Sequence, residues 1–296
     1  MSENTSEQSH TDFSMTPDEY QGLWDANREG GYPANHFAFR QVLNALREER
    51  VENRSRTPRL IEVGIGGGAA ISIYANAGFD VWGFDNNPDM VKTSKSVMQQ
   101  LGLPAGQVAW GDIEDSLSLS PFDAQGGFDS LLAMGVLPHV EHEVVALENM
   151  RQLVRPGGTV IVECRNKLFS LFTFNRFTLE FIMDDLLAGV TGEVRDAAAD
   201  FLATRVDTGM PPLPSSGHEA KYHNPLTIDQ QFLAAGFKDI KILPFHYHAA
   251  MPRFEKPLGE AFRAQSIAME NESSGWRGLF LCSAFVVMAR RPKLGV

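Results

Sequence analysis

One nine-residue stretch, Leu60 to Gly68, constrains the fold of this chain more than any other part of the sequence. It reads Leu-Ile-Glu-Val-Gly-Ile-Gly-Gly-Gly, so a short apolar run passes through one acid into a cluster of glycines. The apolar run is typical of a parallel strand buried on both faces. The glycines favour a tight turn free of side chains, and residues 69–75 can begin a helix directly after it. A strand, a glycine turn and a helix N-terminus together form a slot of the kind that holds nucleotides.

Strands and helices alternate after this stretch, which predicts a parallel sheet with right-handed crossovers. Glycine and proline residues punctuate the alternation at Gly78, Pro88 and Pro156-Gly157-Gly158. The pattern predicts strands at residues 59–63, 79–84, 107–110, 128–133 and 159–163, and helices at residues 88–101 and 140–154. The rhythm returns later with a helix at 227–235, strands at 237–248 and 279–289, and a loop from 249 to 275 between those strands.

Composition and the alternation of predicted strands and helices divide the chain into five parts. Residues 1–14 are polar and predict a disordered tail, and residues 15–58 predict an N-terminal helical cap. Residues 59–164 hold the alternating core, and residues 222–296 complete its sheet. Between them, residues 165–221 begin rich in phenylalanine and end rich in proline. This insertion is expected to be a helical lid that binds a partner, and a helical pair that only packs on the core is the alternative.

Composition also excludes several classes of function. The formal net charge of −11 argues against a nucleic-acid partner, because phosphate backbones are bound by basic surfaces. No apolar run approaches the roughly 20 residues of a membrane span, and the first 14 residues hold no hydrophobic signal segment. We therefore expect a cytoplasmic monomer or homodimer with no membrane partner. The two cysteines, Cys164 and Cys282, lie in apolar runs and predict buried free thiols.

Acidic residues follow the predicted strands at the edge where the glycine turn lies. Asp85 closes the second strand, where a carboxylate can accept hydrogen bonds from both hydroxyls of a ribose. Asp112 follows the third strand, where a second carboxylate can accept from the exocyclic amine of adenine. The spacing Gly64-x-Gly66-x-x-Ala69 also satisfies the dinucleotide fingerprint, so a nicotinamide cofactor is open at this point.

Five motifs in a fixed order resemble the class I S-adenosylmethionine-dependent methyltransferases that act on small molecules. They are the acid-glycine loop at 62–68, Asp85, Gly111-Asp112, the strand that starts Phe128-Asp129 with His139 downstream, and Arg155-Pro156-Gly157-Gly158. The match covers residues 59–164 and, more weakly, 222–290, and Glu62 stands where aspartate is commoner in the family. The resemblance implies an α/β, Rossmann-like, doubly wound sheet of seven strands whose last strand is antiparallel.

The resemblance also implies S-adenosyl-L-methionine as the cofactor and a role for each matching residue. Glu62 is expected near the methionine end of the cofactor, Asp85 on the ribose and Asp112 on the adenine amine. The other implied cofactor-binding residues are the loop glycines, the flanks of the adenine and the neighbours of the sulfonium, namely Gly64, Gly66, Gly68, Asn86, Ile113, Ala133 and Met134. The implied activity is in-line transfer of a methyl group, in which alignment of the acceptor contributes much of the rate.

The acceptor is less constrained than the methyl donor. No Asp/Asn-Pro-Pro-aromatic motif and no Pro-Cys pair follows the fourth predicted strand, which argues against methylation of adenine or cytosine in DNA. The expected partner is therefore a small molecule bound under the insertion. The accepting atom can be oxygen, nitrogen or carbon.

Two histidines are predicted catalytic bases for an acceptor that loses a proton. His139 lies beside the expected sulfonium region, and His223 precedes the helix that follows the insertion. For His139, shaping of the loop is the alternative. His246 and His248 share a face of one predicted strand and could line the acceptor pocket or bind a metal, with core or surface positions as the alternative. His139 and His142 form a weaker candidate metal pair on one predicted helix, and no metal site is predicted overall.

Two other functions stay open on the sequence. One is a nicotinamide-dependent oxidoreductase that uses the dinucleotide fingerprint. The other is a catalytically inactive, methyltransferase-like binding protein that keeps the fold. The antiparallel last strand implied by the resemblance favours a methyltransferase, because a dehydrogenase would not need it.

Overall fold

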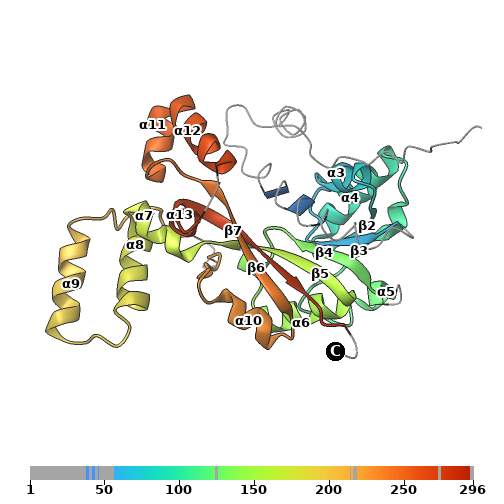
Figure 1. Ribbon diagram of the computed structural model, residues 1–296, viewed down its shortest axis with the longest axis horizontal. Coiled ribbons are helices and arrows are strands. Elements are labelled where there is room, and N and C mark those ends of the chain that lie inside the picture. The colour runs from blue at the N-terminus through green and yellow to red at the C-terminus, as the bar shows by residue number, and fades with distance from the viewer. Residues whose placement is uncertain are drawn as a thin grey trace, which may run out of the picture.

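A computed structural model of the chain describes residues 38–39, 42–43, 46, 57–123, 126–213, 215, 219–272 and 275–293. Within these ranges, seven strands form one sheet in the order β3-β2-β1-β4-β5-β7-β6 (Figure 1). Strands β1 to β5 are parallel, and β7 runs antiparallel to both of its neighbours, β5 and β6. The predicted α/β, Rossmann-like sheet with an antiparallel last strand is therefore confirmed.

The first half of the sheet follows the predicted ranges closely. Its strands are β1 (Arg59–Val63), β2 (Asp80–Asp85), β3 (Val108–Trp110) and β4 (Phe128–Ala133). The α-helices between and after them are α3 (Ile71–Asn76), α4 (Pro88–Gln100), α5 (Ser120–Asp123) and α6 (Glu143–Leu153), with 3-10 turns η2 (Ala105–Gln107) and η3 (Leu137–His139). Helix α6 begins three residues later than predicted, because the backbone N–H groups of Glu141 and His142 donate to the carboxylate of Glu114.

The second half departs more from the predicted bounds. Its strands and helices are β5 (Val154–Arg165), α10 (Ile228–Ala234), β6 (Lys238–Tyr247), α13 (Arg277–Leu281) and β7 (Cys282–Arg290). Strand β5 is longer than predicted at both ends, since Val154 pairs with Phe128 and Arg165 pairs with Ala284. Strand β7 starts later than predicted because α13 occupies the residues before it. Cys164 and Cys282 are free and buried, as predicted.

The predicted loop from 249 to 275 is wrong. Most of these residues form η6 (Pro252–Phe254), α11 (Glu255–Leu258) and α12 (Glu260–Asn271). The buried side chains of α12 are Phe262, Ser266 and Glu270, so its inner face is largely polar. Glu270 accepts from the backbone N–H of Tyr247 at 2.7 Å, which ties α12 to the end of β6. A helix held by polar contacts lacks the apolar period that identifies a helix in sequence.

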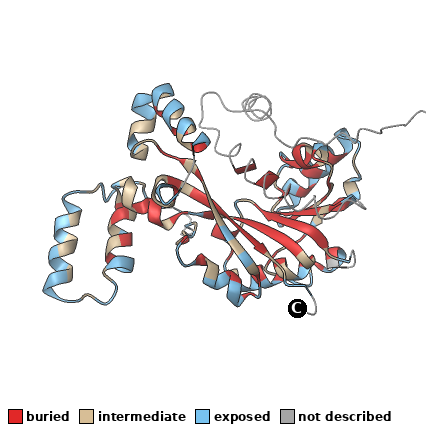
Figure 2. Ribbon diagram, in the orientation of Figure 1, coloured by how far each residue is buried: buried red, intermediate tan, exposed pale blue. Residues whose placement is uncertain are grey.

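The insertion is helical over much of its length. It contains η4 (Lys167–Phe169), α7 (Ser170–Thr173), α8 (Arg176–Glu180), the π-helix η5 (Phe181–Leu186) and α9 (Glu193–Ala203). In Figure 1, α7 lies against the strand ends, whereas α8 and α9 extend away from the sheet. Helix α9 has no buried residue and is drawn mostly as exposed in Figure 2. Closure of this insertion over the core as a lid stays a prediction.

The core lies on both faces of the sheet, as the buried strands in Figure 2 show. Ile161 of β5 packs in one hydrophobic cluster, and its neighbours Val160 and Val162 pack in the other. Five described residues of the predicted N-terminal cap are helical and buried in the first cluster, namely Ala38, Phe39, Val42, Leu43 and Leu46. The rest of that cap and the predicted tail lie outside the described residues. No helix in the described ranges is long and apolar enough to cross a membrane.

Gly158 provides a test of how the turn before the core of β5 is packed. A Cβ at this position would lie 2.9 to 3.0 Å from the backbone oxygens of Arg155, Asp129 and Phe128. We expect Gly158→Ala to lower the free energy of unfolding by about 1–3 kcal/mol. The three oxygens belong to the backbone of β4 and β5, which are paired in the sheet, so the backbone cannot move away from the added methyl group without straining that pairing. Gly106→Ala is the matched control, since a Cβ there meets no atom within 4 Å. Urea denaturation measures both, and equal losses would contradict this packing.

Candidate functional site

A cavity of about 250 Å³ opens where the carboxyl ends of β1, β2, β3 and β4 meet, and we name it the strand-end pocket. In a parallel sheet this edge is the usual place for a ligand. Phe84, Gly111, Glu114, Val136 and Val140 are lining residues that the sequence prediction missed. Of the predicted cofactor-binding residues, those that line it are Gly64, Asp85, Asn86, Asp112, Ile113 and Met134.

Of the loop glycines Gly64, Gly66 and Gly68, only Gly64 lines the strand-end pocket. Gly64 has a φ of 65°, and a Cβ there would lie 2.6 Å from Cγ2 of Val136 in the loop after β4. A Cβ on Gly68 would lie 3.3 Å from Cα of Ser94, so this glycine lets the loop pack on α4. The loop glycines therefore serve close packing as well as the open pocket wall.

Asp85 is the centre of the hydrogen bonds at this edge. Its Oδ2 accepts from the backbone N–H of Gly66 at 2.8 Å, and its Oδ1 accepts from the backbone N–H of Asn87 at 2.9 Å. Asn87 in turn caps α4 by accepting from the backbone N–H of Asp89. Each carboxylate oxygen keeps a further acceptor position for a ligand. A buried, fixed carboxylate in the pocket wall is suited to bind hydroxyl groups.

Asp112 and Ile113 also line the strand-end pocket, after the strand that pairs with the one Asp85 closes. Oδ1 of Asp112 accepts from the backbone N–H of Glu114 at 2.9 Å, which fixes the turn after β3. The carbonyl of Ile113 accepts from Nδ2 of Asn149 on α6 at 2.7 Å. The pocket thus combines a carboxylate and an apolar side chain in adjacent positions, which suits a flat ring that carries an amine.

Glu62 and Ala133 are buried and do not line the pocket. Oε2 of Glu62 has no hydrogen-bond partner among the described residues. Burial, and secondly the charge of Asp85, raise the pKa of Glu62 to about 8. The carboxyl group of Glu62 is therefore mostly protonated at neutral pH, and a nearby cation would favour its ionised form.

The two predicted catalytic histidines line different pockets. His139 lies in η3, is exposed and lines the strand-end pocket. His142 is the N-cap residue of α6, so the predicted pair of His139 and His142 on one helix is wrong. Among the residues that the structure describes, no group of three or more His, Cys, Asp or Glu side chains could hold a metal ion.

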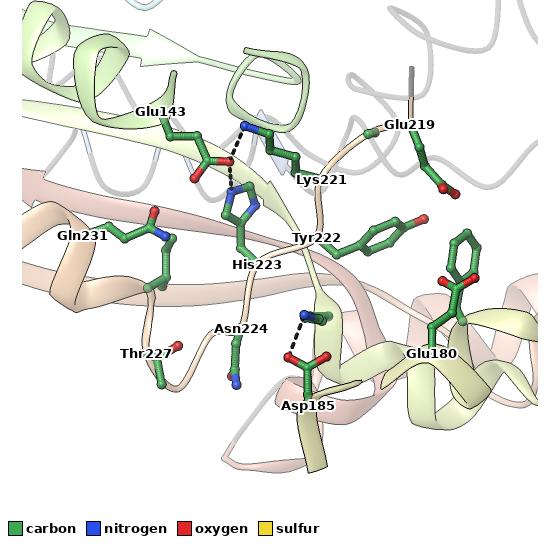
Figure 3. Close-up of a pocket in the computed structure, with 14 residues that line it drawn as sticks. Glu143, Glu180, Asp185, Glu219, Lys221, Tyr222, His223, Asn224, Thr227 and Gln231 are labelled. Carbon is green, nitrogen blue, oxygen red and sulfur yellow. Dashed lines mark hydrogen bonds and ion pairs between the residues drawn. The ribbon is translucent and has the colours of Figure 1, made fainter. Parts of the chain in front are cut away.

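His223 lines a separate cavity of about 590 Å³, which we name the polar pocket (Figure 3). Its Nε2 lies 3.2 Å from Oε1 of Glu143, and Nζ of Lys221 lies 3.4 Å from the same oxygen. Burial alone would raise the pKa of Glu143, but the hydrogen bonds and charges of His223 and Lys221 hold it below its ordinary value. The cluster fixes the segment after the insertion against the start of α6.

A third cavity, of about 610 Å³, lies where β5 ends and the insertion begins, and we name it the aromatic pocket. His246 lines it, and His248 stacks on His246 with ring centroids 4.6 Å apart. Burial, and secondly the charge of His248, lower the pKa of His246 to about 3, and burial lowers that of His248 to about 4. Both imidazoles are therefore neutral at neutral pH. His246 has a φ of 64°, a left-handed conformation that is uncommon outside glycine.

Glu163 is the functional candidate that the sequence prediction missed. It lines the aromatic pocket, and its carboxylate accepts a hydrogen bond from the backbone of Gly135, a residue of the strand-end pocket. Burial raises its pKa, although this hydrogen bond and the charge of Arg165 oppose the shift. An acid at the carboxyl end of the fifth strand was the available sequence signal. Glu163 therefore connects the two pockets.

Part of the chain is similar in sequence to known methyltransferases. Residues 61–162 match a family described as "Methyltransferase domain" (Methyltransf_11). The ubiquinone biosynthesis O-methyltransferase of Caulobacter sp. (strain K31) is 27% identical over 165 residues, which cover 51% of this chain and 64% of the relative. The enzyme of the same name from Xanthomonas campestris pv. campestris (strain B100) is 27% identical over 143 residues, which cover 48% of this chain and 58% of the relative. The chain thus spans less than two thirds of the length of these curated relatives.

Two solved structures of low sequence identity are also similar to this chain. Magnesium protoporphyrin IX methyltransferase from Synechocystis PCC 6803, with bound S-adenosylhomocysteine, is 14% identical, with a TM-score of 0.49 and 93% of both chains covered. A SAM-dependent methyltransferase from Archaeoglobus fulgidus is also 14% identical, with a TM-score of 0.44 and coverage of 85% of this chain and 94% of the other.

The raised pKa of Glu62 predicts a pH-dependent stability. A carboxyl whose folded pKa lies above its unfolded value contributes stability that is fully present below the unfolded pKa and is lost as pH rises through the folded one. The window here runs from about 4.5 to about 8. We expect Glu62→Gln to raise the free energy of unfolding by about 2 kcal/mol or more at pH 8 and by much less at pH 4.5. Urea titrations across this range measure it.

The control for this measurement is Glu148→Gln, which changes an exposed acid of α6. It should leave the same pH profile in place. A Glu62→Gln profile parallel to that of the wild type would show that Glu62 ionises normally in the folded protein.

Proposed function

We propose that the chain is a class I S-adenosylmethionine-dependent methyltransferase and that it transfers a methyl group from S-adenosylmethionine to a small-molecule acceptor. The match of residues 61–162 to the methyltransferase-domain family supports this proposal. The observation that carries the proposal is the strand-end pocket, where Asp85 and Asp112 line one cavity together with Gly64 of the glycine loop. Both carboxylates are held by backbone hydrogen bonds, so they are in place before a ligand arrives.

The groups of the pocket fit this cofactor. Asp85 offers acceptors for the ribose hydroxyls, and Asp112 offers one for the adenine amine, with Ile113 against the ring and Asn86 at its flank. The unsatisfied buried oxygen of Glu62 suits the charged methionine end. When bound, S-adenosylmethionine supplies a methyl group that its sulfonium has already activated. The chain itself then has to hold the donor, exclude water and align the acceptor.

Some of the other implied cofactor residues line the strand-end pocket, and others do not. Met134 lines the pocket after β4, whereas Ala133 is fully buried at the end of that strand. Gly64 keeps the wall open beside Val136. Gly66 and Gly68 do not line the pocket; the backbone N–H of Gly66 donates to Asp85, and Gly68 allows the loop to contact α4.

We place the acceptor in the aromatic pocket. Its volume of about 610 Å³ is in the range of small-molecule sites, and aromatic side chains of the insertion line it. Glu163 connects it to the strand-end pocket through Gly135. This contact supports an arrangement in which donor and acceptor occupy neighbouring cavities on one sheet edge.

The first test is binding of S-adenosylhomocysteine by isothermal titration calorimetry. We expect the wild type to bind and Asp85→Ala to bind at least about tenfold more weakly, because hydrogen bonds to a charged group contribute about 1.5–3 kcal/mol each. Asp115→Ala is the control, since Asp115 is exposed and lies outside the pocket. Absence of binding by the wild type would overturn the proposal, and tight binding of NAD alone would favour the oxidoreductase.

The second test concerns the predicted bases. Once labelled cofactor and metabolite pools identify an acceptor, we expect His139→Ala to lower turnover more than it lowers cofactor affinity. His223→Ala is expected to act in the same sense through the polar pocket, where it removes the partner of Glu143. Full turnover in both variants across the pH range would exclude these histidines as bases. Absence of any labelled product would favour the inactive, methyltransferase-like binding protein.

A further inference from the structure

The aromatic pocket contains two arginines that the rest of the site does not use. We propose that Arg165 and Arg253 bind an anionic group of the acceptor, and that the acceptor is an aromatic acid whose ring fills this pocket. The inference rests on the proposed function, because it names the substrate class of the same site.

The body of the pocket favours a flat apolar ligand. Phe169, Phe174, Phe177 and Tyr222 all line it, and the rings of Phe177 and Tyr222 lie 5.2 Å apart. Phe174 remains 42% exposed, although phenylalanine is normally buried. Aromatic side chains bind rings through large contact areas and offset or edge-on geometry. A ring in this cavity would cover apolar surface that the protein leaves open.

The two guanidinium groups are available for an anion. Among the described residues, neither Arg165 nor Arg253 has a carboxylate within ion-pair distance. Each lies over a ring instead, Arg165 at 6.0 Å from the centroid of Tyr222 and Arg253 at 4.9 Å from that of Phe254. A guanidinium stacked on a ring keeps its N–H edge free for a two-pronged contact with a carboxylate.

Arg176 and Arg195 in the insertion, unlike Arg165 and Arg253, form ion pairs with carboxylates. Arg176, at the start of α8, pairs with Glu180 at 2.9 Å and with Glu219. Arg195 of α9 pairs with Asp184 at 3.0 Å. Arg176 and Arg195 are therefore neutralised by carboxylates, whereas the two arginines at the pocket have no carboxylate within ion-pair distance among the described residues.

Of the acids that line the pocket, Glu163 interacts electrostatically with Arg165, but among the described residues neither Glu163 nor Asp207 forms an ion pair with Arg165 or Arg253. Glu163 accepts from the backbone of Gly135, and Oδ1 of Asp207 accepts from the backbone N–H of Gly209 at 3.2 Å. Both carboxylates thus have hydrogen-bond partners within the protein. Burial also raises the pKa of Glu163, although the hydrogen bond from Gly135 and the charge of Arg165 oppose the shift.

The distance between Glu163 and Arg165 along β5 leaves room for one aromatic ring between the methyl-accepting atom and the anionic group. Glu163 and Arg165 are two residues apart and lie on the same face of the strand, which places their Cα atoms roughly 7 Å apart. Glu163 marks the end of the pocket next to the methyl donor site. The accepting atom therefore belongs near Glu163, with the anionic group on the opposite side of the ring, near Arg165 and Arg253.

The test uses a matched pair of probes, 4-hydroxyphenylacetate and its neutral amide, 4-hydroxyphenylacetamide. Each is titrated calorimetrically into the full chain saturated with S-adenosylhomocysteine. We expect the carboxylate to bind at least about tenfold more tightly than the amide. Arg165→Gln and Arg253→Gln should each reduce this preference to less than about threefold, with little change in the affinity for the amide. Arg205→Gln is the matched control, because Arg205 also lies over a ring, that of Phe201, but outside the pocket.

The outcomes separate this inference from the proposed function. Failure of the wild type to bind S-adenosylhomocysteine would overturn the proposed function itself. If S-adenosylhomocysteine binds normally, three results would overturn only the proposed acceptor class. These are that neither probe binds, that the amide binds as well as the acid, or that the preference for the acid survives in both pocket variants. An equal loss of preference in Arg205→Gln would also overturn it, because the effect would then reflect net charge and not the pocket.

Discussion

The carboxylate of Asp85 is the contact on which the strand-end pocket depends. One oxygen holds the glycine loop after β1 through Gly66, and the other holds the start of α4 through Asn87. Three separate elements therefore meet at one buried charge, and the cost of burying that charge is offset by hydrogen bonds that also fix the pocket wall. The same residue can bind a ligand because each of its oxygens retains an acceptor position.

The antiparallel strand β7 explains why a second pocket lies beside the first. It enters between β5 and β6 and pairs with β5 up to Arg165, so it extends the sheet beyond the point where the parallel strands stop. Ser283 and Ala284 at its start and His246 near the end of β6 then form the floor of the aromatic pocket, and α7 with its flanking residues forms the wall. Topology thus places a cavity lined by the insertion next to one lined by the strand ends.

Local patterns explain what the sequence could predict. The strands of the core and the acids after them follow from short apolar runs and glycine or proline punctuation, which act over a few neighbouring residues. Helix α12 was missed because its inner face carries Ser266 and Glu270, which are buried through hydrogen bonds and not through apolar packing. Glu163 was missed for a different reason. Its role depends on contact with Gly135 in the loop after β4, and a single sequence does not show that contact in any local pattern.

The two pockets differ in what holds them, and this difference has a consequence for specificity. The strand-end pocket is built from residues that follow sheet strands and are fixed by backbone hydrogen bonds, so changing one of them disturbs the fold as well as the ligand. The aromatic pocket is lined mainly by side chains of the insertion and of the segment after β6, which carry few backbone constraints of the sheet. If the acceptor binds in the aromatic pocket as proposed, substitutions there can change which acceptor fits without disturbing the donor site. A constant donor with a variable acceptor is what this division of the structure favours.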